Sequence, residues 1–134
     1  MAEPFIYVGT LGIKEGKLEE VKRSWQAVVE VVEEHEPQMI AFHAFVNEDG
    51  TEMTVIQVHP DAASMDSHLE LLRDRLGEQL TRALGPELFE FRRAEYYGTP
   101  SESALEMDRQ LPGLAVDLKP THLAGFTRAM NPEA

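Results

Sequence analysis

Residues 38–76, QMIAFHAFVNEDGTEMTVIQVHPDAASMDSHLELLRDRL, decide the fold. Positions 39–46 alternate between two sets that are both mostly apolar, which predicts a strand covered on both faces. The turn at 47–50 ends in Asp-Gly, a pair favoured in tight turns because glycine takes positive φ without a Cβ clash. Residues 51–59 form a second run rich in β-branched side chains, so the stretch predicts a β-hairpin.

A helix is expected directly after this hairpin. Pro60 cannot donate a ladder hydrogen bond and therefore ends the strand, and Asp61 is placed to cap a helix. From Ala62 to residue 76, apolar side chains recur at helical spacing, which predicts an amphipathic helix.

The segments on either side of the hairpin and helix complete the fold. Residues 5–13 predict a strand in which Gly9 and Gly12 leave room for a close neighbour, either a packed helix or a ligand. The helix at 14–36 has a buried stripe of Leu18, Val21, Trp25, Val28 and Val32. A break at residue 77, a short helix at 78–84 and a strand at 87–98 follow. The order β-α-β-β-α-β is the ferredoxin-like arrangement of the α+β class, with both helices on one face of the sheet.

Two features of the chain concern its organisation beyond this subunit. We expect residues 1–98 to form the ferredoxin-like domain and residues 99–134 to form a C-terminal extension. The extension predicts a short helix at 101–110 and one or two strands, at 114–118 and 122–128, which either lengthen the sheet edge or cross to a partner subunit. Apolar residues occur on both faces of the strands although helices cover only one, so we predict a homodimer in which a second copy covers the other face.

Composition narrows the classes of partner. The chain of 134 residues has 12 basic and 24 acidic residues, a net charge of −12, which argues against binding to nucleic acid or to anionic membranes and favours solubility. There is no cysteine, and hence no disulfide or thiolate zinc site. No apolar run is long enough to span a membrane, and no signal peptide is recognisable, so a cytoplasmic location is the default expectation.

The element order, the length, and the hairpin running into VHPDAASMDSHLELL at 58–72 resemble the antibiotic biosynthesis monooxygenase superfamily of dimeric α/β barrels. The resemblance covers roughly residues 5–98 and implies subunits that dimerise sheet to sheet. It also implies a substrate between sheet and helices, since some members oxygenate quinols or polyketide phenols with molecular oxygen and without metal or flavin. Other members degrade haem, but Trp25 lies on the first helix and not just ahead of His68, a departure that disfavours haem cleavage.

The resemblance points to His68 as the catalytic residue. His68 lies at the border of the apolar stripe of the second helix, where a neutral imidazole could accept a proton from a phenol or quinol. The alternative is a histidine that bonds a backbone carbonyl and has no chemical role.

The other candidate site residues are aromatic or cationic side chains expected to contact a substrate. They are Tyr7, Trp25, His43, His59, Phe89 and Arg93. Each has a structural alternative: the aromatics could be core, the hairpin histidines could face the dimer interface, and an arginine at 92 or 93 that points to a covered face could pair with a glutamate. The histidines lack compact metal-ligand spacing, and no nucleotide-binding motif is present, so we expect neither metal nor cofactor.

The sequence therefore predicts a cofactor-independent monooxygenase acting on a small aromatic or quinol substrate. Two alternatives stay open: a dimer of the same fold that binds a small apolar molecule without turnover, and a stress-related or structural dimer with a filled core.

Overall fold

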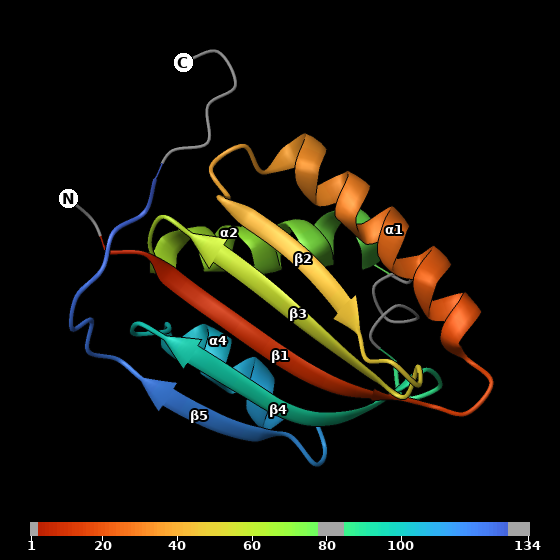
Figure 1. Cartoon of the computed structure of the whole chain (residues 1–134). Helices are drawn as coiled ribbons and strands as arrows, with labels where there is room; N and C mark the ends of the chain where they lie inside the picture. Colours follow the sequence, from red (N-terminus) through yellow and green to blue (C-terminus); the bar gives the residue numbers. More distant parts are fainter. Residues whose placement is uncertain (1–2, 78–84, 129–134) are drawn as a thin grey trace.

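The computed structural model describes residues 3–77 and 85–128. In chain order the elements are β1 (Phe5–Ile13), α1 (Leu18–His35), β2 (Ala41–Val46), β3 (Glu52–His59), α2 (Ala62–Leu71), the π-helical turn η1 (Leu72–Leu76), β4 (Phe89–Tyr97), α4 (Glu102–Arg109) and β5 (Ala115–Lys119). One sheet has the strand order β2-β3-β1-β4-β5, and the three α-helices pack on one face of it (Figure 1). The predicted α+β ferredoxin-like fold is confirmed. The helix expected at 78–84 lies outside the described residues.

The β2–β3 hairpin forms as predicted, and one side chain organises its turn. Asn47 Oδ1 accepts hydrogen bonds from the backbone N–H groups of Thr51 and Glu52, both at 2.9 Å. Gly50 has φ of +74°, the left-handed conformation that glycine adopts at no steric cost. The next turn is also as expected, because Asp61 Oδ1 accepts from the Ser64 N–H at 3.0 Å and caps α2.

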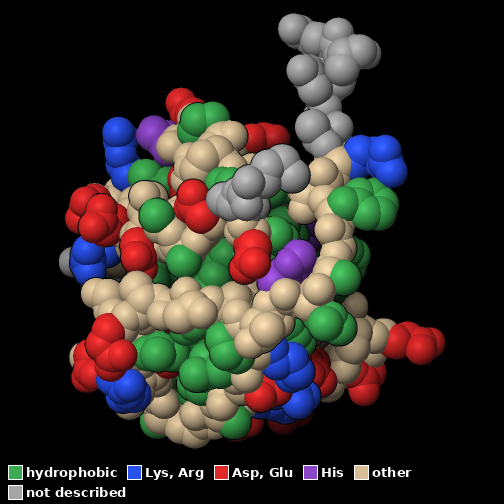
Figure 2. Space-filling model, turned by 90° about the vertical axis from the view of Figure 1, so that its left-hand side faces the viewer, with side chains coloured by type: hydrophobic (Ala, Val, Ile, Leu, Met, Phe, Trp, Pro, Cys, Tyr) green, Lys and Arg blue, Asp and Glu red, His purple; other side chains and the backbone are tan. Residues whose placement is uncertain are grey.

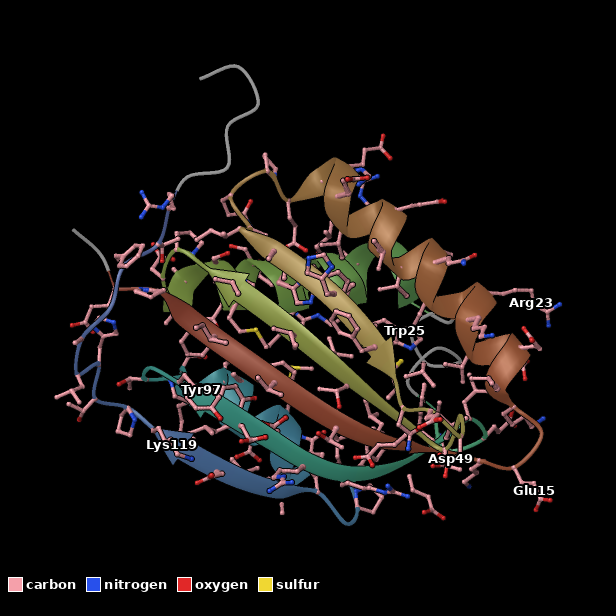
Figure 3. All side chains as sticks on the ribbon, in the orientation of Figure 1. Glu15, Arg23, Trp25, Asp49, Tyr97 and Lys119 are labelled. Carbon is pink, nitrogen blue, oxygen red and sulfur yellow. The ribbon has the colours of Figure 1, made fainter. Side chains whose placement is uncertain are left out.

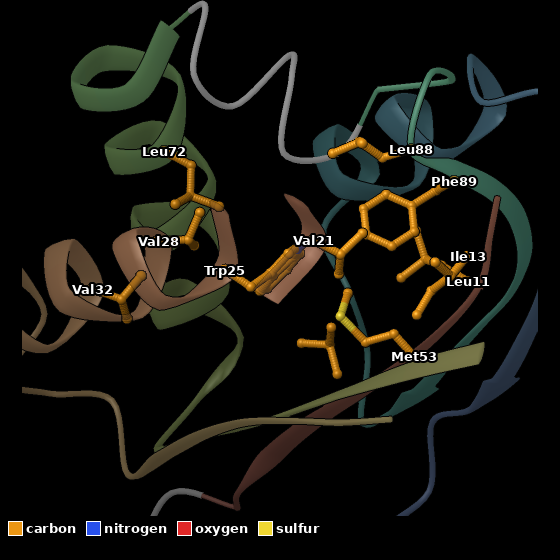
Figure 4. Packing of buried hydrophobic residues seen from close by; sticks show 11 residues of the cluster. Leu11, Ile13, Val21, Trp25, Val28, Val32, Met53, Leu72, Leu88 and Phe89 are labelled. Atoms are coloured by element: carbon orange, nitrogen blue, oxygen red, sulfur yellow. The ribbon is translucent and has the colours of Figure 1, made fainter. Parts of the chain in front are cut away.

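The expected buried stripe of α1 packs on the sheet and forms the main core. Val21, Trp25, Val28 and Val32 are buried, and Leu18 packs against them from the edge of this cluster. In Figure 4, side chains of α1 meet those of β1, β3 and β4 from the opposite side. Figure 3 shows the charged end of Arg23 pointing away from the sheet, so α1 divides into an apolar and a charged face as its sequence predicts.

A β-bulge in β4 changes which side chains face the helices. Leu11 of β1 pairs with Phe91, but its neighbour Thr10 pairs with Arg93, so one extra residue is inserted in β4. With strict alternation along the strand, Tyr96 would lie on the face opposite Phe91. The bulge brings Tyr96 opposite Tyr7, on the side that carries the helices.

Neither Arg92 nor Arg93 points to a face that the single chain covers, but each arginine pairs with a glutamate, which was the alternative given for them. Both side chains are exposed; Arg92 lies 3.4 Å from Glu52 and Arg93 lies 3.9 Å from a carboxylate oxygen of Glu95. The Arg92 guanidinium occupies the space above Gly12, where a Cβ would come within 2.6 Å of it. The space at Gly12 therefore accommodates an arginine side chain and not a helix.

The C-terminal extension adds to the same sheet. β5 pairs in parallel with β4, and α4 packs on the helical face beside α2 (Figure 1). The second strand predicted at 122–128 is wrong, because these residues form no strand.

The second face of the sheet is left without helices in the described parts of the chain (Figure 1). Strand β2 lies at the sheet edge, and its Phe45 is 61% exposed. The prediction that both faces of this strand are covered therefore does not hold within a single chain. Tyr97 of β4 and Lys119 of β5 lie together near the other edge of the sheet, and the Lys119 ammonium is 5.5 Å from the centroid of the Tyr97 ring (Figure 3).

At the face seen in Figure 2, acidic side chains are scattered and hydrophobic side chains lie between them. None of the helices in the described ranges is sufficiently long and apolar to cross a membrane.

Candidate functional site

A pocket of about 140 Å³ lies between the helical face of the sheet and the helices. Most of its walls are apolar: Leu11, Trp25, Val28, Phe42, Val55, Met65, Leu69, Leu72, Phe91, Met107, Leu111 and Leu114. The polar side chains among the lining residues are fewer: Tyr7, Thr10, Gln57, His68, Arg93, Tyr96 and Asp108. An apolar cavity with a few convergent polar groups is the usual form of a small-molecule site.

His68 forms a buried pair with Glu36. The Nδ1 atom of His68 lies 2.6 Å from Glu36 Oε2, and the two side chains are 1% and 3% exposed. His68 lies in the last turn of α2, while Glu36 is the residue that caps the C-terminal end of α1. The end of α1 against α2 thus holds a carboxylate and an imidazole together, away from water.

This pairing fixes the roles of the two ring nitrogens of His68. A carboxylate only accepts hydrogen bonds, so Nδ1 carries a hydrogen and donates it to Glu36. Nε2 makes no hydrogen bond to any described residue, and in the neutral ring it holds the free lone pair. A carboxylate that orients an imidazole and stabilises its protonated form is a recurring arrangement for general-base catalysis.

A second histidine lies behind this pair in a polar network. His59 is 0% exposed; its Nε2 donates to Gln57 Oε1 at 2.9 Å, and its Nδ1 accepts from Ser64 Oγ at 2.7 Å. Gln38 Nε2 makes longer contacts of 3.4 Å to Ser64 Oγ and to Glu36 Oε1. The network therefore links β3, the start of α2 and the His68–Glu36 pair.

Burial determines the protonation state of His59. Desolvation lowers its pKa to about 4, with the neighbouring His68 ring acting in the same direction. His59 is therefore neutral near pH 7, as its hydrogen bonds to Ser64 and Gln57 require.

The other polar cluster of the pocket comes from β1, β4 and α4. The Tyr96 hydroxyl donates a hydrogen bond to Asp108 Oδ2. Burial, and then the hydrogen bond with Asp108, raise the pKa of Tyr96 well above its usual range. Burial and the nearby Asp108 charge likewise raise the pKa of Tyr7, and burial raises that of Asp108 itself. Both phenols are protonated donors near neutral pH.

The structure brings together some of the candidate residues and separates others. Tyr7, Trp25, His68 and Arg93 all line the pocket, although the Arg93 side chain is largely exposed. His59 does not line it but lies next to His68, with ring centroids 5.9 Å apart.

Two candidate residues lie elsewhere. His43 is exposed on the edge strand β2, and Phe89 is a core residue packed with Ile13 and Val21 (Figure 4). Within residues 3–77 and 85–128, no three histidine or acidic side chains are grouped to hold a metal ion.

Sequence reasoning did not assign Glu36 or Asp108 to the site. A weak signal exists for each. Glu36 ends a helix, where a carboxylate is unfavourable against the helix dipole and needs another partner. Asp108 follows Ala104 by four residues and so shares the buried side of α4.

Comparison with known proteins supports the fold. No protein-family model and no curated protein matches the sequence. Among solved structures, MupZ from Pseudomonas fluorescens is similar over 98% of both chains, with 20% identity and a TM-score of 0.67. SnoaB, a cofactor-independent oxygenase from Streptomyces nogalater, is similar over 75% of this chain and 96% of its own, with 12% identity and a TM-score of 0.60.

A putative antibiotic biosynthesis monooxygenase from Nitrosomonas europaea gives a similar result. The match covers 74% of this chain and 92% of the other, with 13% identity and a TM-score of 0.61. The chain thus has the ferredoxin-like fold found in antibiotic biosynthesis monooxygenase structures, and the resemblance deduced from the sequence is confirmed at the level of the fold. At 98% coverage, the match to MupZ takes in the C-terminal extension as well.

Proposed function

We propose that this protein is a cofactor-independent monooxygenase that acts on a small aromatic or quinol substrate. The observation that carries the proposal is the buried His68–Glu36 pair at the wall of a mostly apolar pocket. The pocket suits a flat apolar ring, and the pair suits the removal of a proton from a hydroxyl on that ring.

The first step is proton transfer from a substrate hydroxyl to Nε2 of His68. The resulting imidazolium is stabilised by Glu36, 2.6 Å from Nδ1, and this attraction is strong because both side chains are buried. The substrate anion is electron-rich and can reduce molecular oxygen directly.

The reaction is balanced without an external reductant. For a quinol, oxidation by one O₂ gives a hydroxyquinone and one water. One oxygen atom enters the ring, the other leaves as water, and the substrate supplies all four electrons. The protein's part is to bind the ring, to remove the proton and to keep water from the reactive anion.

Oxygen uptake with a panel of quinols and phenols tests the proposal. We expect substrate-dependent uptake by the wild type and a loss of about 100-fold or more in His68→Gln, the size of a general-base contribution. The exposed His122 lies outside both the pocket and the strands and provides a matched control, and His122→Gln should retain activity. Saturable binding of the panel without uptake would overturn the monooxygenase proposal and favour a non-catalytic binding protein.

A homodimer is the second part of the proposal. The helix-free face of the sheet presents Ile6 and Val8 of β1 next to Ile56 and Val58 of β3. These side chains are only partly buried in one chain, and a second sheet would cover them. Light scattering should give twice the chain mass at micromolar concentration. A monomer mass for the wild type would contradict the dimer.

A further inference from the structure

Asp108 is a largely buried carboxylate with one oxygen that keeps some accessible surface and makes no hydrogen bond to the described residues. Its residue is 9% exposed, it lines the pocket, and the Tyr96 hydroxyl donates to its Oδ2. Oδ1 makes no hydrogen bond to any residue in the described ranges. A buried carboxylate normally accepts several hydrogen bonds, because desolvating its charge is costly.

Tyr7 presents an unused donor beside this carboxylate. Tyr7 pairs with Tyr96 across β1 and β4, their rings are 5.2 Å apart, and Asp108 is its charged neighbour. Its ring lies over Gly9, where a Cβ would come within 2.6 Å of the hydroxyl oxygen. In the described part of the chain this hydroxyl has no hydrogen-bond partner. The absence of a side chain at Gly9 leaves the phenol free to lie in the pocket.

The pocket volume limits what can occupy it. A cavity of roughly 150 Å³ in another protein binds benzene, and the present pocket measures about 140 Å³. One six-membered ring therefore matches the volume of the pocket.

We propose that Asp108 and Tyr7 form a second substrate-contacting group that binds one hydroxyl of a single-ring substrate. The hydroxyl donates to Asp108 and accepts from Tyr7, and Tyr96 is a positioning residue that orients the carboxylate. Taken with His68, which contacts another hydroxyl, this arrangement selects a ring with two hydroxyl groups. This inference rests on the proposed function for the role of His68, but the hydroxyl-binding group stands on its own contacts.

The C-terminal extension supplies the decisive residue. Asp108 belongs to α4, which lies after the β-α-β-β-α-β elements, and Met107 and Leu111 of the same segment also line the pocket. The extension thus closes one side of the pocket and determines which substituents a bound ring can carry.

Calorimetric titration under argon tests the inference without turnover. Hydroquinone is the probe with two hydroxyls, and toluene is a probe of similar size with none. We expect Asp108→Leu and Tyr7→Phe each to weaken hydroquinone binding about tenfold or more, the effect of losing one hydrogen bond to a buried polar group. Toluene binding should change less than threefold. Glu106→Gln is the control, because Glu106 is an exposed residue on the same helix.

The possible results separate this inference from the proposed function. Equal loss of both probes would mean that the variants merely distort the pocket, and unchanged hydroquinone binding would mean that Asp108 and Tyr7 do not contact the ligand; either overturns the inference. Tyr7→Phe removes one oxygen and little volume, so it decides the matter if Asp108→Leu fails to fold. If the variants lose hydroquinone binding selectively, and the wild type takes up no oxygen with any quinol or phenol of the panel, the hydroxyl-binding group is supported and the monooxygenase proposal is overturned.

Discussion

Buried neutral His59 should make the protein less stable in mild acid. Its pKa is lowered to about 4 in the folded protein, against about 6.5 in an unfolded chain. Between these two values the unfolded state binds more protons at this position than the folded state does. The free energy of unfolding must therefore fall as the pH is lowered from 6.5 toward 4.

The size of this effect follows from the shift in pKa. A difference of about 2.5 pKa units corresponds to roughly 3 kcal/mol, at about 1.4 kcal/mol per unit. His59 is 0% exposed and both ring nitrogens are hydrogen-bonded, so solvent does not screen the added charge. The loss is complete below the folded-state pKa of about 4.

Urea unfolding at a series of pH values from 7 to 4 measures the effect. Carboxylates also titrate in this range, so the quantity of interest is the difference between wild type and His59→Gln, which cannot titrate at this position. We expect the wild type to lose about 3 kcal/mol more than the variant. His122→Gln removes an exposed histidine outside the strands, and this control should follow the wild type. If His59→Gln shows the same pH dependence as the wild type, the reasoning about burial is refuted.

Three further substitutions test individual contacts. Glu36→Gln keeps the shape but removes the charge beside His68, and we expect a loss of about 2 kcal/mol in urea unfolding; an unchanged stability would mean that the pair contributes nothing. Gly9→Ala places a Cβ 2.6 Å from the Tyr7 hydroxyl and should cost about 1–3 kcal/mol and weaken ligand binding; full binding would show that the phenol is free to move. Asp61→Ala removes the cap of α2 and should cost about 1 kcal/mol in thermal unfolding, and a variant as stable as the wild type would argue against the cap.

The parts of the fold that sequence predicted are those determined by local chemistry. The hairpin follows from a turn whose Asn47 and Gly50 act within a few residues, and the start of α2 follows from Asp61 in the same way. The buried stripe of α1 follows from the helical period. Each depends on residues close in sequence, so composition and spacing are sufficient to predict it.

The faces of β4 were not predictable by the same means. Alternation holds only while pairing is regular, and one inserted residue near Arg92 reverses it for the rest of the strand. Tyr96 reaches the pocket for this reason. The sequence around the bulge contains no glycine or proline that would indicate it.

The candidate site was predicted in part. His68 and Tyr7 lie in the pocket because each belongs to the apolar side of a correctly predicted element. The partners of His68 and Tyr96 come from distant positions: Glu36 is 32 residues from His68, and Asp108 is 12 residues from Tyr96. Such pairs are formed by tertiary packing, which spacing along the chain does not reveal.

A single-turnover reaction under ¹⁸O₂ tests most directly the claim that His68 and Glu36 activate the substrate for oxygen. The protein in excess is mixed anaerobically with a quinol that binds, exposed to labelled oxygen and quenched for mass spectrometry. We predict one labelled atom in the product of the wild type, with formation slowed about 100-fold or more in His68→Gln. Unlabelled product, or labelled product that forms equally fast in His68→Gln, would contradict the account.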